Sequence, residues 1–153
     1  MKHRWAALVI VLALGWLVPG IAAAQETSNP PSAGERNPGV KLGQNYPNPF
    51  NPATTIPFSI GDPPSCVADG GRQHHVTLRI YNVLAQLVAI PVLQGGTEGT
   101  GQQTMNLSLT CGSYAASWDG HYMSTSQEVP SGVYIYLLEV DGRSIGKKMI
   151  VMR

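Results

Sequence analysis

The chain has few charged residues and no long block of one sign. Only 12% of its 153 residues are Asp, Glu, Lys or Arg, and the formal net charge is +1. Proteins that bind nucleic acid or an anionic membrane electrostatically need a basic patch to neutralise phosphates. Because no such run is present, the sequence predicts no nucleic-acid partner.

Motifs of catalysis and cofactor binding are lacking as well. The sequence has no G-x-S-x-G nucleophile elbow, no phosphate-binding loop and no convincing pair of acids. The residues that could suggest a metal or acid–base site are His74, His75, His121, Asp62, Asp69 and Asp119. His74 is expected in a loop and His75 at the start of a strand, so their side chains should diverge. We therefore expect no enzyme, no cofactor, no metal site and no small-molecule substrate.

One long apolar run is present, at the N-terminus. A positively charged start (2–4) precedes an apolar stretch (5–18), and three alanines (22–24) follow. This order is typical of a cleavable secretory signal peptide. The apolar run is shorter than the ~20 residues that a membrane-spanning helix needs, so an uncleaved anchor is the weaker alternative. We expect residues 1–24 to be removed, leaving Gln25 first.

Residues 25–41 are rich in Pro, Ser, Asn and Gly and poor in bulky apolar side chains. Such a segment cannot bury enough surface to offset the entropy of ordering, so it predicts a flexible linker. Residues 42–153 are then expected to form one domain.

Cysteine is nearly absent, with Cys66 and Cys111 alone in the sequence. An even count in an exported chain favours one disulfide bond. Two reduced and buried thiols are the alternative. Without a C-x-x-C pair, a redox or metal motif is disfavoured.

Apolar residues alternate with a period of two in about seven short segments, separated by turn residues. The expected strands are 55–60, 75–83, 87–93, 105–109, 114–118, 133–140 and 145–152. Pro57 and Pro91 imply edge positions or bulges, and Asp141-Gly142 suits a two-residue hairpin turn. Together these features predict an all-β, Ig-like antiparallel β-sandwich.

Side-chain directions follow from the same alternation. Trp118 is expected in the core, because a large aromatic residue anchors a small sandwich. In the last strand Met149 and Val151 should face the core, while Lys148 and Ile150 face outward.

An unusual motif opens the domain: Asn45-Tyr46-Pro47-Asn48-Pro49-Phe50-Asn51-Pro52. Its prolines fix φ and extend the residues before them, and its asparagines favour Asx turns. We expect a stiff lead-in segment whose Tyr46 and Phe50 can fold onto the domain.

With later motifs, this opening resembles the type A C-terminal sorting domain of the bacterial type IX secretion system. The later motifs are Ile80-Tyr81-Asn82-Val83-Leu84, Trp118-Asp119-Gly120, Ser131-Gly132-Val133-Tyr134 and Lys147-Lys148-Met149-Ile150-Val151. Ala85 stands where the family usually has glycine. The pattern is similar also to the Ig-like domain of flagellar hook-capping proteins.

The resemblance implies a non-catalytic sorting signal. Its partner would be an outer-membrane secretion translocon, and the protein would reach the cell surface or the medium after a periplasmic intermediate. The alternative is a free-standing structural Ig-like subunit of an envelope or extracellular assembly, with another envelope protein as its partner.

Overall fold

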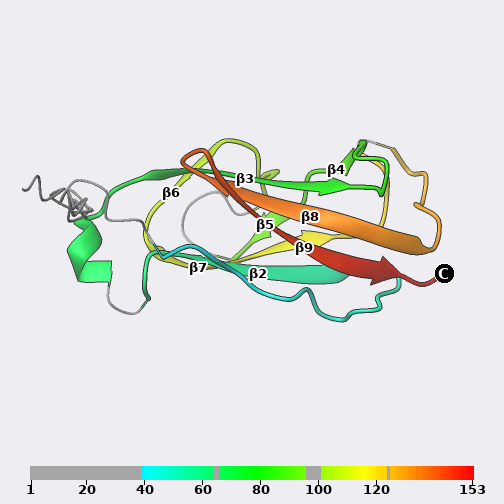
Figure 1. Cartoon of the computed structure of the whole chain (residues 1–153), viewed down its shortest axis with the longest axis horizontal. Coiled ribbons are helices and arrows are strands. Elements are labelled where there is room, and N and C mark those ends of the chain that lie inside the picture. The colour runs from blue at the N-terminus through cyan, green and yellow to red at the C-terminus, as the bar shows by residue number, and fades with distance from the viewer. Residues whose placement is uncertain (1–38, 64–65, 96–100, 124) are drawn as a thin grey trace, which may run out of the picture. The chain divides into compact units, whose positions relative to one another are not determined.

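The computed structural model describes residues 39–63, 66–95, 101–123 and 125–153. The expected signal peptide and nearly all of the expected linker lie outside these residues. The described residues form an all-β domain of two antiparallel sheets, as predicted (Figure 1). None of their helical turns is long and apolar enough to cross a membrane.

Sheet A has the strand order β1-β2-β7-β5, and sheet B has the order β4-β3-β8-β9, with β6 also paired to β3. The strands of sheet A are β1 (Lys41–Leu42), β2 (Thr54–Ile60), β5 (Val92–Gln94) and β7 (Gly112–Trp118). Those of sheet B are β3 (His74–Tyr81), β4 (Leu87–Ala89), β6 (Leu107–Leu109), β8 (Gly132–Val140) and β9 (Arg143–Val151).

Pro57 lies in the middle of β2 without breaking the pairing of β2 with β7. Its carbonyl accepts a hydrogen bond from the amide of Gly43 at 2.8 Å, on the side of β1. In an antiparallel strand the N and O of one residue point to the same side. The missing N–H of Pro57 therefore faces the short segment β1, which explains why the proline is tolerated although β2 is neither the predicted edge strand nor bulged at this residue.

The expected strand 87–93 is wrong as a single element. It forms two strands, β4 in sheet B and β5 in sheet A, and the chain crosses between the sheets at Ile90-Pro91. Pro91 has no N–H to donate to a ladder, so regular pairing ends before it. This division and the extra strand β1 raise the count in the described residues from the expected seven to nine.

The expected strand 105–109 is shorter than predicted. Asn106 has a φ of 52°, in the left-handed region, and only Leu107–Leu109 form β6. Asparagine tolerates this conformation better than most residues. Met105 precedes the left-handed residue Asn106 and is exposed, so it does not share a face with Leu107 and Leu109.

The core lies between the two sheets and includes Ile56, Leu78, Trp118, Tyr136 and Leu138, all buried. Trp118 is therefore a core residue, as predicted.

The β8–β9 hairpin closes sheet B. Its turn residues Asp141 and Gly142 have φ of 49° and 80°, as a type I′ turn requires. Met149 and Val151 are buried, whereas Lys148 and Ile150 are exposed. The predicted turn and the predicted sides of β9 are both confirmed.

Cys66 and Cys111 form the predicted disulfide bond, with Cα atoms 5.6 Å apart. It joins the 3-10 turn η1 (Cys66–Asp69) to the turn between β6 and β7. A disulfide of this kind indicates an oxidising, extracytoplasmic environment.

Candidate functional site

An aromatic cluster unites three of the motifs that are far apart in the sequence. Phe50 is 1% exposed, and its ring centroid lies 5.5 Å from that of Trp118. The ring of Tyr134 packs edge-on against Trp118 with centroids 5.6 Å apart. Such tilted and edge-to-face contacts add to the stability that burial alone provides. The opening motif, β7 and β8 thus share one core.

The opening motif is also hydrogen-bonded to the end of β9. The amide of Phe50 donates to the carbonyl of Ile150 at 3.0 Å, and the amide of Met152 donates to the carbonyl of Phe50 at 3.1 Å. The amide of Ile150 donates to Oδ1 of Asn48 at 2.9 Å. The segment therefore runs beside the last residues of β9 (Figure 1), in a short parallel pairing.

Asn45 anchors the start of the same motif from a buried position. Its Nδ2 donates to Oγ1 of Thr54 at 2.9 Å and to the carbonyl of Pro47 at 3.1 Å. Its amide donates to the hydroxyl of Tyr136 at 3.1 Å, and that hydroxyl donates to the carbonyl of Gly43. Burial raises the pKa of Tyr136, which outweighs the opposite effect of the hydrogen bond from Asn45. The tyrosine thus stays neutral and can donate.

Tyr46 differs from the expectation. Its backbone pairs with Thr55, but its side chain is 59% exposed, so it does not fold onto the core as Phe50 does.

Arg153 connects the remaining motifs to the end of the chain. Its guanidinium donates to the carbonyl of Gly120 at 2.7 Å and pairs with Glu128 at 3.1 Å. Its amide donates to Oγ of Ser131 at 2.8 Å. Gly120 has a φ of 76°, and a Cβ there would lie 2.8 Å from the carbonyl of Pro52. The close approach requires glycine in the Trp118-Asp119-Gly120 turn.

Lys147 and Lys148 lie on opposite sides of β9. Lys148 is exposed on the outer face of sheet B, and Lys147 is half-buried on the other side. Neither forms an ion pair with a described residue. The carbonyl of Lys148 accepts a hydrogen bond from Nε2 of Gln44 at 3.1 Å. Between Ser144 and Lys148 the outer edge of β9 makes no backbone–backbone hydrogen bond within the described residues.

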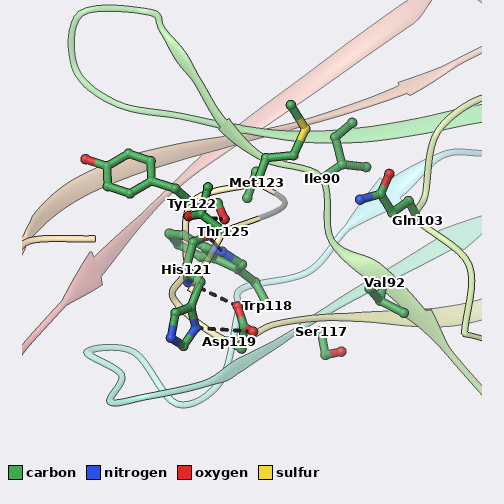
Figure 2. A pocket seen from close by; sticks show the side chains of 11 residues that line it. Ile90, Val92, Gln103, Ser117, Trp118, Asp119, His121, Tyr122, Met123 and Thr125 are labelled. Carbon is green, nitrogen blue, oxygen red and sulfur yellow. Dashed lines mark hydrogen bonds and ion pairs between the residues drawn. The ribbon is translucent and has the colours of Figure 1, made fainter. Parts of the chain in front are cut away.

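A pocket of about 230 Å³ lies where β5 and β7 meet the loop that follows β7 (Figure 2). Trp118 lines it and donates from Nε1 to the carbonyl of His121 at 2.9 Å. Nδ1 of His121 lies 3.2 Å from Oδ2 of Asp119. In Figure 2 the carboxylate of Asp119 stands between His121 and Ser117, and no described hydrogen bond joins those two.

His74 occupies a different position from the one expected. It is the first residue of β3, fully buried, and not a loop residue. Its Nδ1 lies 2.7 Å from Oδ2 of Asp141, and its Nε2 lies 3.2 Å from Oδ2 of Asp69. His75 is exposed, so the two side chains diverge as predicted. Among the described residues no group of three or more His, Cys, Asp or Glu could hold a metal ion.

The His74 cluster and the Arg153 contacts were not predicted. Asp69 and His74 are near neighbours in the sequence, but Asp141 joins them only through the pairing of β3 with β8. No spacing rule indicates such a contact. The contact of His74 with Asp69 holds η1 in place, and the contact of Arg153 with Gly120 holds the loop after β7 in place.

The fold and these contacts define a domain of two antiparallel β-sheets with one disulfide bond. The opening motif packs into the core of this domain and is hydrogen-bonded to the edge of the last strand. No protein-family model, no curated protein and no solved structure matches the chain.

Proposed function

We propose that this chain is a non-catalytic exported module that acts as a type IX secretion sorting signal. The surface read by the translocon would be formed by the opening motif and β9. One observation carries this proposal: four of the five motifs, in 45–52, 118–120, 131–134 and 147–151, contact one another or Arg153.

Ring contacts and hydrogen bonds join these motifs to one another. Phe50, Trp118 and Tyr134 pack against one another in the core, and Arg153 donates hydrogen bonds to Gly120 and Ser131. Their joint packing supports a single unit with a common role. Lys148 is exposed on the same strand and is free to contact a partner.

The experiment compares surface display in a host that has a type IX translocon and in the same host without it. Deleting the residues after Gly146 would remove Met149 and Val151 from the core and unfold the domain. The double variant Lys147→Ala/Lys148→Ala leaves these core side chains in place. Lys41→Ala, an exposed lysine in sheet A, is the matched control.

We expect the wild-type protein and Lys41→Ala to reach the surface only when the translocon is present. The double variant should remain in the periplasm with an unchanged melting temperature. Surface display that does not depend on the translocon would contradict the sorting role.

A second candidate function, a structural subunit of an envelope or extracellular assembly, is favoured by the open edge of β9. Within the described residues the outer edge of β9 makes no hydrogen bond between Ser144 and Gly146, so this stretch can accept an added strand. Translocon-independent display together with co-purification of an envelope protein, lost in Gly146→Pro, would support this function instead. A proline at 146 removes an outward N–H from that edge.

A further inference from the structure

His74 is a fully buried imidazole that lies between two carboxylates. Its Nδ1 lies 2.7 Å from Oδ2 of Asp141, in the turn between β8 and β9. Its Nε2 lies 3.2 Å from Oδ2 and 3.4 Å from Oδ1 of Asp69, at the end of η1. The ring therefore connects η1 to the hairpin that closes sheet B.

Both contacts together require a ring that carries two protons. An ionised carboxylate only accepts hydrogen bonds, so each ring nitrogen must donate, and only the imidazolium has an N–H at both positions. A neutral ring has one N–H and directs the lone pair of its other nitrogen at a carboxylate. Protonation of His74 thus decides whether one or both of its contacts can form.

The two carboxylates are not held equally well. Oδ1 of Asp141 also accepts a hydrogen bond from the amide of His75 at 2.9 Å, and the amide of Asp141 donates to the carbonyl of His75 at 3.0 Å. The contact with Asp69 is longer and is shared between its two carboxylate oxygens. A neutral His74 should therefore keep its proton on Nδ1, facing Asp141, and Asp69 should be the partner that is lost.

Loss of this contact would affect the segment that carries the disulfide bond. Asp69 is the last residue of η1 and Cys66 is the first. The disulfide ties η1 to Cys111, and the contact of Asp69 with His74 is a second attachment. The side chain of Asp69 is 18% exposed, so its carboxylate can reach water when the contact breaks.

The carboxylates of Asp69 and Asp141 are the charged groups that face the ring directly. β6, which pairs with the start of β3, carries no titratable side chain. Near this end of the domain the neighbouring elements also carry Arg72, His75, Arg79, Glu139 and Arg143. The charge of Arg72 acts on Asp141, Arg79 and Glu139 form their own ion pair at 3.1 Å, and His75 is exposed.

We propose that protonation of His74 is a latch that holds η1 on sheet B. The latch is closed while the ring is charged and both carboxylates are ionised. As the pH rises and Nε2 loses its proton, its lone pair faces the carboxylate of Asp69, and η1 is released. Histidine is the side chain that ordinarily changes charge between about pH 5 and about pH 8, so the latch responds to the pH of an extracytoplasmic environment. It does not depend on the proposed sorting role.

The test is nuclear magnetic resonance of the isotope-labelled protein from about pH 5 to about pH 9. The nitrogen chemical shifts of the His74 ring count its protons, and backbone order parameters report the mobility of residues 66–72. At the acidic end we expect two ring protons and a rigid η1, with order parameters of about 0.85. With rising pH the proton on Nε2 should be lost, and the order parameters of η1 should fall below about 0.6 at the same midpoint.

The variant Asp69→Asn distinguishes the latch from a purely structural contact. An asparagine amide can accept from a protonated Nε2 or donate to a neutral one, so η1 should stay ordered over the whole pH range. Asp62→Asn, the same substitution at an exposed carboxylate, is the matched control and should release η1 as the wild type does. The proposal is overturned if η1 stays ordered in the wild type while Nε2 loses its proton, or if the ring keeps the same number of protons at every pH. Release of η1 in Asp69→Asn at the wild-type midpoint would overturn it as well.

Discussion

Phe50 and Ile150 are joined by a hydrogen bond of 3.0 Å from the amide of Phe50 to the carbonyl of Ile150. This bond places the beginning of the domain against its last strand. The ring of Phe50 is buried against Trp118 at the same time. One residue therefore stabilises both the edge of β9 and the core, and the two ends of the domain should fold together.

Phe50→Ala should lower the free energy of unfolding by about 3–5 kcal/mol, because it leaves a cavity next to Trp118. Tyr46→Ala in the same motif, at an exposed side chain, should change it by less than about 0.5 kcal/mol. Urea denaturation of both variants measures the difference. Similar losses for the two variants would show that Phe50 is not an anchor of the core.

Reduction of the Cys66–Cys111 bond should lower the free energy of unfolding by about 4 kcal/mol, because the sequence separation is 45 residues and the unfolded chain gains that loop entropy. Urea titrations with and without reductant measure the loss. The variant Cys66→Ser/Cys111→Ser should match the reduced protein and be insensitive to reductant. An unchanged transition midpoint on reduction would argue against this stabilisation.

Ala85→Gly should raise the free energy of unfolding by about 1 kcal/mol, because glycine adopts a φ of 59° without steric cost. The control Ala115→Gly lies in β7, where glycine only adds freedom to the unfolded chain, and should lower stability by roughly 0.5–1 kcal/mol. Thermal and urea unfolding distinguish the two signs. Destabilisation at both positions would mean that the turn gains nothing from glycine.

The pH dependence of stability should report on Asp141. Burial alone would raise the pKa of Asp141, but hydrogen bonds from His74 and from the amide of His75, with the charges of His74 and Arg72, lower it below its ordinary value of 3.8. A carboxylate with a lowered pKa in the folded state contributes stability above its unfolded pKa. That contribution is lost as the pH falls through the folded value.

Urea unfolding at several pH values below about 4 should therefore show a steeper loss of stability in the wild type than in Asp141→Asn. Asparagine tolerates the positive φ of this position, so the turn is kept. Asp62→Asn, at an exposed carboxylate, serves as the control and should retain the wild-type slope. Parallel slopes for wild type and Asp141→Asn would contradict the assignment.

Local patterns predicted a large part of the fold. The alternation of apolar residues over 55–60 indicated β2, and Asp141-Gly142 indicated the hairpin that closes sheet B. The disulfide was favoured over two reduced thiols because the number of cysteines is even and the N-terminus is typical of an exported chain. These features depend on neighbours in the chain, which the sequence displays directly.

The path of the chain between the sheets was not predictable in the same way. Residues 87–93 are apolar throughout, and such a run indicates that most of its residues are buried without indicating against which sheet. The partners of His74 and Arg153 were hidden for a related reason. Asp141 and Gly120 come near them only after other strands have paired.

By itself the sequence determined the all-β class, the buried side of the last strand and the hairpin turn, and it favoured the disulfide, because each follows from local periodicity, turn chemistry or the number of cysteines. Only the tertiary structure decided that β4 and β5 belong to different sheets, that the opening motif lies along β9, and that His74 lies between Asp69 and Asp141. Those relationships join segments whose distance in space is set by the packing of the two sheets and not by their separation along the chain.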